Sequence, residues 1–221
     1  MRIAIIIGAN NVSVSIAKLL SDRYEVVIVD KSDEACAKAF KALKSSAMVY
    51  KGDPSSVDVL NEVGIDKAEL FLALSDDDDL NYKACSIAKE KGVPIIIARV
   101  NNKDHEDLFK ELNITSTVNV EDIVSNNIRN AILSDTTKVL FTDPTTNISF
   151  AIIKIGSDSS IVGKQINYLI DNYNVAIPYI ITSNGIIKPG NDYVIEGDNE
   201  IVVVGPSESI DKFIKEVSST E

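Results

Sequence analysis

Residues 2–34, RIAIIIGANNVSVSIAKLLSDRYEVVIVDKSDE, decide the fold of the chain. An apolar, β-branched run leads into Gly8, a helical pattern begins near Asn11, and a second apolar run ends at Asp30. Strand, glycine turn, helix and strand in this order, with a carboxylate about 20 residues past the turn, are typical of a dinucleotide-binding unit. The stretch therefore predicts a nucleotide-binding fold at the N-terminus.

The glycine turn departs from the usual pattern G-x-G-x-x-G. Gly8 keeps the first position, but Asn10 and Ser13 stand where the other two glycines belong. Asparagine is the best non-glycine choice where a positive φ is needed, although its side chain takes up space near a phosphate. Ser13 is small enough to let the helix pack closely on the strand. Because a helix N-terminus offers free N–H groups and a positive dipole end, we expect a weakened anion site made by Gly8, Ala9, Asn10, Asn11 and Val12.

Asp30 ends the second predicted strand, where a carboxylate hydrogen-bonds ribose hydroxyls in such folds. The same charge would repel a 2′-phosphate, which disfavours NADP, although the adjacent Lys31 reduces the repulsion. The alternative is that Asp30 is a solvated residue that caps the next helix.

The composition limits the classes of function. The 221 residues suffice for two modest domains, and a net charge of −11 argues against binding to nucleic acid or to an anionic membrane surface. No signal peptide is recognisable, and no apolar run approaches the roughly 20 residues that span a bilayer. Any membrane role would therefore need a partner protein. Cys36 and Cys85 lack a C-x-x-C spacing and are expected to be free buried thiols in a reducing cytosol.

Up to residue 135, short apolar runs alternate with helical patterns. Each run is apolar on both faces, as in a buried parallel strand. Helix-start signals precede several helices, including Asp53 as a cap followed by Pro54 at the first helical position. We expect a Rossmann-like, doubly wound α/β domain with about six strands over residues 1–135.

The pattern changes beyond residue 135. The polar, turn-rich residues 136–147 predict a linker. Residues 148–221 then follow the order strand, helix, three strands and helix, with a hairpin turn at Asn184-Gly185. This half is expected to be a small α+β domain.

Residues 75–81, SDDDDLN, invite comparison with a metal site. Four adjacent carboxylates cannot all point inward, so a helix cap followed by acids that complement the helix dipole is favoured. His105 has no second His or Cys nearby and is expected at an exposed helix start. With one histidine and no G-x-S-x-G motif, no catalytic set is recognisable, which favours a sensor over an enzyme.

Several longer motifs resemble those of the TrkA-type regulators of potassium uptake, the RCK or KTN family, and together they cover nearly the whole chain. In chain order the motifs are VVIVD (26–30), YKGDPSSVDVLNEVGIDKAELFLALSDDDDLNYKACSIAKEKGV (50–93), IIARVNNKDHEDLFKELNI (96–114), IVGKQINYL (161–169), Pro189-Gly190 and IEGDNEIVVVGPSESIDKF (195–213).

The resemblance implies an N-terminal domain that binds NAD(H) or an adenine nucleotide and an RCK C-terminal (TrkA-C) domain that dimerises. It further implies dimers assembled into a tetrameric or octameric ring, which couples the nucleotide to a membrane potassium channel or transporter at its cytoplasmic side. Carried over by motif, Asp53 falls near the adenosine, while Ser75 and Asp76 face the phosphates. Lys31 and Arg99 are further candidates for the same site.

Asn11 decides which nucleotide is expected. Its neutral amide cannot offer the charged fork with which arginine holds a terminal phosphate. NAD(H), AMP or ADP is therefore expected to bind better than ATP. Two other functions stay open: a small NAD-dependent oxidoreductase, and a structural ring subunit whose nucleotide site has decayed.

Overall fold

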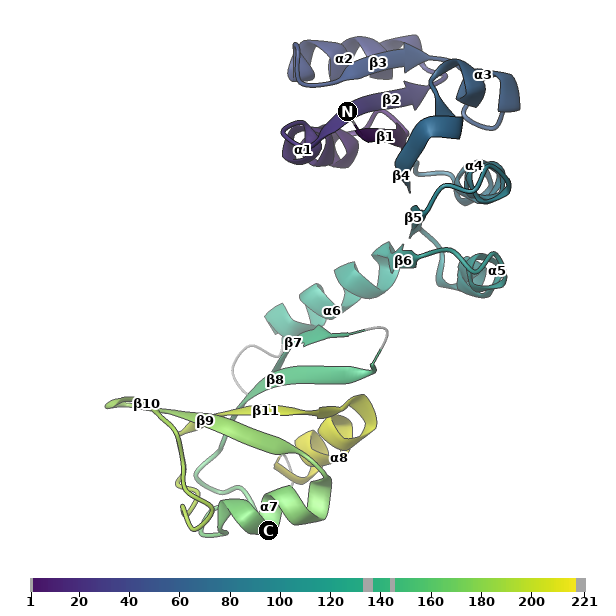
Figure 1. Cartoon of the computed structure of the whole chain (residues 1–221). Coiled ribbons are helices and arrows are strands. Elements are labelled where there is room, and N and C mark those ends of the chain that lie inside the picture. The colour runs from purple at the N-terminus through teal and green to yellow at the C-terminus, as the bar shows by residue number, and fades with distance from the viewer. Residues whose placement is uncertain (1, 133–136, 144–145, 218–221) are drawn as a thin grey trace. The chain divides into compact units, whose positions relative to one another are not determined.

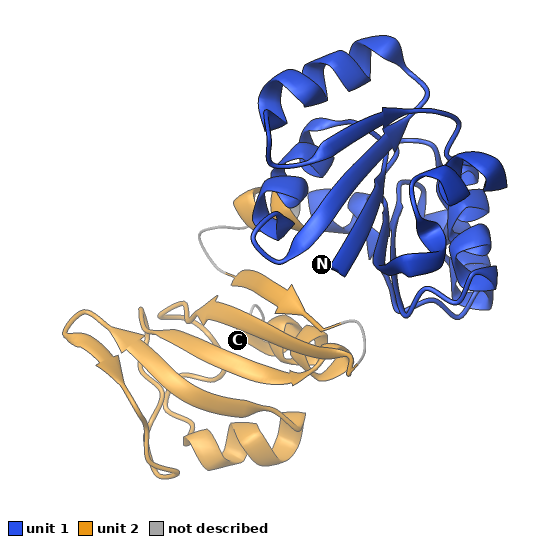
Figure 2. Cartoon of the chain, turned by 45° about the horizontal axis from the view of Figure 1, so that its top comes forward, with its two compact units in different colours: residues 1–124 blue, residues 125–221 orange. Residues whose placement is uncertain are grey.

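The computed structural model of the chain describes residues 2–132, 137–143 and 146–217 (Figure 1). The chain forms two compact units, residues 1–124 and 125–221, which Figure 2 colours separately. The boundary between them falls within helix α6 (Val120–Ile132). Each unit has its own sheet and its own core.

The first unit contains a six-stranded sheet in which every neighbouring pair is parallel, in the order β3-β2-β1-β4-β5-β6. Its strands are β1 (Arg2–Ile7), β2 (Tyr24–Asp30), β3 (Met48–Lys51), β4 (Ala68–Ala73), β5 (Ile95–Val100) and β6 (Ser116–Asn119). The strand order reverses between β1 and β4, which creates a crevice at the carboxyl ends of these strands. The predicted doubly wound sheet is confirmed.

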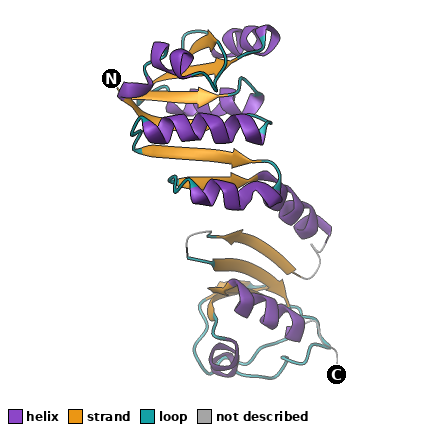
Figure 3. Ribbon diagram, turned by 90° about the vertical axis from the view of Figure 1, so that its right-hand side faces the viewer, coloured by secondary structure: helices purple, strands orange, loops and turns teal. Residues whose placement is uncertain are grey.

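Helices cover both faces of this sheet (Figure 3). Ala4 and Ile6 of β1 pack toward α1 and α2, whereas Ile5 and Ile7 pack on the opposite face toward α3, α4 and α5. Because both faces are buried, the strands need apolar residues at every position. The helices are α1 (Asn11–Leu20), α2 (Asp33–Leu43), α3 (Val57–Glu62), α4 (Asp78–Glu90) and α5 (Glu106–Glu111), with the 3₁₀ turns η1 (Ile65–Lys67) and η2 (Lys103–His105).

The start of α3 differs from the prediction. The helix begins at Val57 and not at Pro54, and its cap is Ser56, whose Oγ accepts a hydrogen bond from the Val59 N–H. Asp53 Oδ1 instead accepts hydrogen bonds from the N–H and the hydroxyl of Ser55. Because the Asp53 carboxylate is engaged in this local turn, it does not cap the helix.

The second unit contains a five-stranded antiparallel sheet in the order β10-β9-β11-β8-β7. Two helices pack against it, and the shared core includes Ile153, Ile201, Leu169 and Phe213. The small α+β domain is thus confirmed as a fold. Its elements are β7 (Thr137–Thr142), β8 (Ile148–Lys154), α7 (Ile166–Tyr173), β9 (Ala176–Thr182), β10 (Gly185–Ile187), β11 (Glu200–Pro206) and α8 (Ser207–Val217).

Strand β7 corrects the prediction of a linker over residues 136–147. It lies inside that stretch and pairs with β8 along the edge of the sheet. The apolar residues of β7 were too few to outweigh the polar residues around them in the sequence. The side-chain amide of Asn130, on α6, hydrogen-bonds both the N–H and the C=O of Val139 in β7.

The hairpin between β9 and β10 also differs in detail. Gly185 pairs with Thr182, so the two loop residues are Ser183 and Asn184. Only Gly185 among these residues has a positive φ, of 126°. The glycine therefore begins the second strand and does not complete the loop.

Candidate functional site

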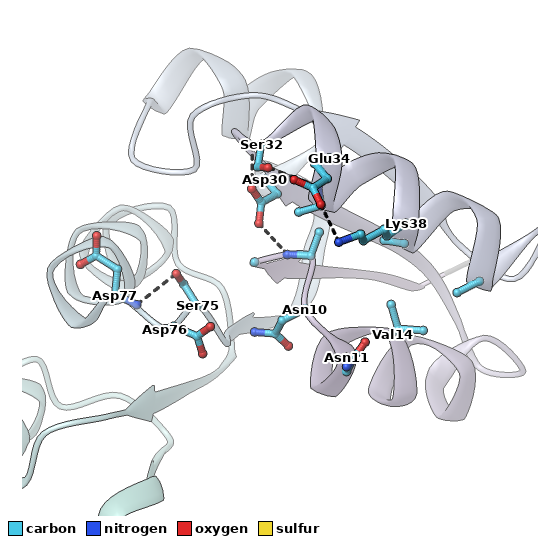
Figure 4. A pocket seen from close by; sticks show the side chains of 15 residues that line it. Asn10, Asn11, Val14, Asp30, Ser32, Glu34, Lys38, Ser75, Asp76 and Asp77 are labelled. Carbon is cyan, nitrogen blue, oxygen red and sulfur yellow. Dashed lines mark hydrogen bonds and ion pairs between the residues drawn. The ribbon is translucent and has the colours of Figure 1, made fainter.

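A cleft of about 620 Å³ opens at the carboxyl ends of β1, β2 and β4, at the point where the strand order reverses (Figure 4). One side is formed by the β1–α1 turn and by β2 with α2, and the other side by the turn between β4 and α4. The residues that line it are Gly8, Ala9, Asn10, Asn11, Val14, Asp30, Ser32, Glu34, Ala35, Lys38, Ala39, Ala42, Ser75, Asp76 and Asp77.

Gly8 is the residue that allows the two sides to meet. Its φ is 91°, a conformation that residues with a side chain rarely adopt. A Cβ at this position would lie 3.0 Å from both the N and the Cα of Ser75. The position therefore requires glycine for its backbone conformation and for the close approach of the second turn.

Asn10 plays a different part from the one expected. Its φ is −92°, so no positive φ is needed at the second glycine position of the pattern. Its side chain caps α1: Oδ1 accepts from the N–H of Ser13 at 3.0 Å, and Nδ2 donates to the carbonyl of Leu74 at 2.7 Å. Ser13 is fully buried, in keeping with a small residue at the contact between helix and sheet.

Asp30 connects the glycine turn to the second strand. Its Oδ2 accepts a hydrogen bond from the Ala9 N–H at 2.7 Å, and its Oδ1 accepts one from the Ser32 N–H at 2.8 Å. The cap of α2 is Ser32, which accepts from the Ala35 N–H, and not Asp30. The carboxylate is thus fixed in orientation at the edge of the cleft.

The second turn is held by a buried amide. Asn81, in α4, is fully buried; its Oδ1 accepts from the Ser75 N–H, and its Nδ2 donates to the carbonyls of Ser75 and Arg99. Asn101 Nδ2 donates to the same Ser75 carbonyl. Sequence reasoning missed Asn81 as a positioning residue because its side chain joins its own turn to β5, a contact that no local pattern reveals.

The acidic run belongs to this framework. Asp77 caps α4 by accepting from the Leu80 N–H, and the buried Asp78 accepts from the N–H groups of Asn101 and Asn102. His105 Nδ1 lies 2.9 Å from Asp78 Oδ2, with its ring half-exposed at η2, next to the start of α5. No group of three potential metal ligands occurs among the described residues. The expected role of a helix cap applies to Asp77. Asp78 instead connects α4 to the segment after β5 through its hydrogen bonds with Asn101 and Asn102.

Burial alone would raise the pKa of the Asp78 carboxyl. The hydrogen bonds from Asn102, Asn101 and His105 outweigh this effect and hold that pKa below its usual range. Asp78 is therefore a stably ionised anchor.

The charges around the cleft are mostly negative. Asp30, Glu34, Asp76 and Asp77 line it, while the one lining cation among the described residues, Lys38, is paired with Glu34 at 2.6 Å. Arg99 is not a lining residue, but its Nη1 forms an ion pair with Asp76, and its buried Nε has no hydrogen-bond partner among the described residues. Such an unpaired buried donor costs about 1–3 kcal/mol.

Of the eleven candidate residues, seven line the cleft: Gly8, Ala9, Asn10, Asn11, Asp30, Ser75 and Asp76. The other four, Val12, Lys31, Asp53 and Arg99, are not among its lining residues. The Asp53 carboxylate accepts a hydrogen bond from the Ser55 N–H, and this bond is the main cause that lowers the pKa of Asp53. Arg99 lies one contact away, through Asp76.

Sequence reasoning missed eight lining residues: the α2 cap Ser32, the α2 residues Glu34, Ala35, Lys38, Ala39 and Ala42, Val14 of α1, and Asp77. The helical spacing of the α2 residues after Asp30 was a usable signal. They recur every three or four positions and so share one side of α2.

Both cysteines are free thiols. Cys85 is fully buried, and burial raises its pKa to about 12, whereas Cys36 is only half-buried. Among the described residues, no helix combines the length and the apolar character needed to cross a membrane.

The six-stranded parallel sheet, with its cleft at the point where the strand order reverses, defines a Rossmann-like class of domain. The chain belongs to the TrkA-N domain family, which matches residues 4–120. A Trk system potassium uptake protein TrkA homolog of Methanothermobacter thermautotrophicus is 27% identical over 207 residues, which cover 93% of this chain and 94% of that protein. A TrkA homolog 1 of Methanosarcina mazei is 24% identical over 96% of this chain, which spans only 48% of that longer protein.

Two solved structures confirm the RCK fold over the whole chain. The GsuK RCK domain has a TM-score of 0.58 at 18% identity, covering 100% of this chain and 49% of that chain. The GsuK channel bound to NAD has a TM-score of 0.60 at 18% identity, covering 100% of this chain and 40% of that chain. The fold class and the family resemblance predicted from the sequence are therefore correct.

Proposed function

We propose that this chain is a regulatory subunit of a potassium channel or transporter and that an adenine nucleotide binds in the cleft of its first unit. The observation that carries the proposal is the arrangement at the switch point of the sheet. There the N-terminus of α1, the Gly8 turn and the fixed carboxylate of Asp30 face one cavity. Parallel α/β sheets bind nucleotides at such a point.

The cleft offers complementary groups to the two ends of a nucleotide. Each oxygen of Asp30 accepts one backbone N–H, which leaves further lone pairs for ribose hydroxyls. The N–H groups of Asn11 and Val12 lie in the first turn of α1, where no intrahelical partner exists, and they suit a phosphate.

The charge of the cleft favours ligands with few phosphate charges. Four carboxylates line it, and Lys38 is already paired with Glu34. NAD(H), AMP and ADP are the proposed ligands, with ATP binding more weakly because Asn11 adds no positive charge. A solved Kef C-terminal domain of Shewanella denitrificans in AMP-bound form has a similar fold, with a TM-score of 0.51 at 22% identity over 59% of this chain.

The proposed role is binding and not catalysis. None of the described residues that line the cleft is a histidine, a tyrosine or a cysteine, and its lysine, Lys38, is paired with Glu34. This lining argues against the proton donors that an oxidoreductase most often uses. The relatives named above are potassium-uptake proteins. A purified chain that oxidised or reduced a substrate with a change in nicotinamide absorbance would contradict this part of the proposal.

The partner is proposed to be a membrane potassium channel or transporter subunit, met at its cytoplasmic face by a ring of these chains. Native mass spectrometry of the purified protein tests the assembly and reports any retained nucleotide. A tetramer or an octamer supports the ring, whereas a strict monomer with no nucleotide would contradict it.

Calorimetric titration tests the nucleotide site. Asp30→Ala is expected to weaken AMP, ADP and NAD binding by about 1–3 kcal/mol, the cost of unpaired buried hydroxyls. Asp33→Ala is the matched control, because Asp33 is an exposed carboxylate on the same helix entry that pairs with Lys51 and is absent from the cleft lining. Equal losses in the two variants would show only a change in general charge.

A further inference from the structure

The Arg99 side chain is placed unusually for a cation. It extends from β5, is only 19% exposed, and has Asp76 as its ion-pair partner. Its Nε is buried without a hydrogen-bond partner among the described residues. Asp76 is 75% exposed and is itself a lining residue of the cleft. A largely buried positive charge is therefore paired with a mostly exposed carboxylate that lines the cleft.

The backbone around this pair is fixed. Asn81 Nδ2 hydrogen-bonds the Arg99 carbonyl, and Asn81 Oδ1 hydrogen-bonds the N–H of Ser75, the residue before Asp76. One buried amide thus holds the backbone of Arg99 and of the residue before Asp76, so the ion pair can open by side-chain rotation while this backbone stays in place.

We propose that Asp76 and Arg99 form a charge switch in the wall of the cleft. In the free protein Asp76 occupies the Arg99 guanidinium, and a phosphate of the bound nucleotide takes the place of that carboxylate. This inference rests on the proposed nucleotide site and adds two roles to it. Arg99 becomes a phosphate-binding residue, and Asp76 becomes the residue that limits the affinity for highly charged ligands.

The chemistry of the two groups supports the exchange. A guanidinium binds carboxylate and phosphate oxygens with the same fork geometry, so one can replace the other. A phosphate at the N-terminus of α1 would repel the Asp76 carboxylate that lines the same cleft. The displaced Asp76 can turn into solvent at low cost because it is already mostly exposed.

The test is a titration of AMP, ADP and ATP into the wild-type chain, Asp76→Asn, Arg99→Gln and the double variant. Asp76→Asn is expected to bind ADP and ATP about five- to tenfold more tightly, a coupling typical of contacting residues. In the Arg99→Gln background, Asp76→Asn should change the affinity less than about twofold, because the guanidinium that this substitution frees is absent.

Asp77→Asn is the matched control. Asp77 is the next residue, lines the same cleft and caps α4, a role that asparagine performs equally well. Its gain should be smaller and should not depend on Arg99. If Arg99→Gln does not fold, the comparison of Asp76→Asn with Asp77→Asn across the three ligands still decides, because only the former should gain affinity with each added phosphate.

The outcomes separate the switch from the proposed site. Two outcomes overturn the switch alone, provided that the wild type binds the nucleotide. Either Asp76→Asn and Asp77→Asn gain the same affinity, or the gain from Asp76→Asn persists in the Arg99→Gln background. Binding seen only in Asp76→Asn would mean that no nucleotide displaces the wild-type carboxylate, which overturns both the switch and the proposed function of the wild-type chain. If neither protein binds a nucleotide, both proposals fail.

Discussion

The two turns that meet in the cleft follow neighbouring parallel strands, and each leads into a capped helix, yet they are held in place by different means. The β1–α1 turn depends on backbone conformation, with Gly8 at a φ of 91° and a cap supplied by Asn10. The β4–α4 turn depends on side chains, because Asn81 fixes both backbone polar groups of Ser75. The first turn is thus determined chiefly by one backbone conformation, and the second by one buried side chain that also reaches the Arg99 carbonyl in β5.

This difference also divides the chemistry between the turns. The first turn presents neutral groups, namely backbone N–H groups and the amides of Asn10 and Asn11. The second turn presents the carboxylates of Asp76 and Asp77. In the proposed function, attraction for an anion comes from the first turn, and discrimination among anions comes from the second.

Replacing Gly8 with alanine should give the largest effect. The variant combines the cost of a positive φ, about 1–2 kcal/mol, with the clash against the Ser75 backbone, about 1–3 kcal/mol. Gly92→Ala is the control, because Gly92 has a φ of 75° but no atom within 4 Å of an added Cβ. Urea unfolding should show Gly8→Ala as clearly the less stable variant. Equal losses would mean that the two turns do not need their close approach.

Asn81→Ala should have the next largest effect, a loss of about 1–3 kcal/mol in the free energy of unfolding, since it leaves the Ser75 N–H without its partner. Nucleotide affinity should fall as well, because Ser75 and Asp76 are no longer held. Asn61→Ala, at an exposed asparagine of α3, should stay within about 0.5 kcal/mol of the wild type. An Asn81→Ala protein with unchanged stability and affinity would show that the second turn does not depend on this buried side chain.

Acid should weaken the second turn through protonation of Asp78. The Asp78 pKa is lower in the folded chain than in the unfolded chain, so its stabilisation is complete above about pH 4 and is lost as the pH falls through the folded value. The slope from one such group is at most about 1.4 kcal/mol per pH unit.

Asp78→Asn should be less stable than the wild type at neutral pH and should lose less stability on acidification. The exposed Asp79→Asn is the control, and it should retain the wild-type acid dependence. Urea unfolding at a series of pH values measures both. An Asp78→Asn variant with the full wild-type slope would assign the acid sensitivity to another carboxylate.

The sequence predicted the first unit well because its signals are local. Apolar runs, Gly8 and the strand-end Asp30 each report their own segment, and the parallel sheet with its cleft follows from them. The second turn could not be predicted to the same depth. The partners of Asn81 lie in β5 and in its own turn, and the acidic run that resembles a metal site is explained only when Asp78 meets Asn101, Asn102 and His105.

Asn10 illustrates a second kind of error. Its identity was interpreted through the glycine that it replaces, so a positive φ was assumed. The structure gives it an ordinary φ and a bond to the Leu74 carbonyl, 64 residues away. In β7, the same reliance on local composition hid a strand, because an edge strand needs only one neighbour and a few apolar residues to form.

The bond between Asn130 and Val139 has a consequence for the solution behaviour of the second sheet. An uncovered edge strand can recruit a strand from another molecule and so begin aggregation. The Asn130 amide supplies a donor and an acceptor to β7 in the way that a neighbouring strand would. It thereby occupies, at the middle of this edge, the groups through which a foreign chain would attach. At the opposite edge, β10 is only three residues long, too short to template much intermolecular pairing.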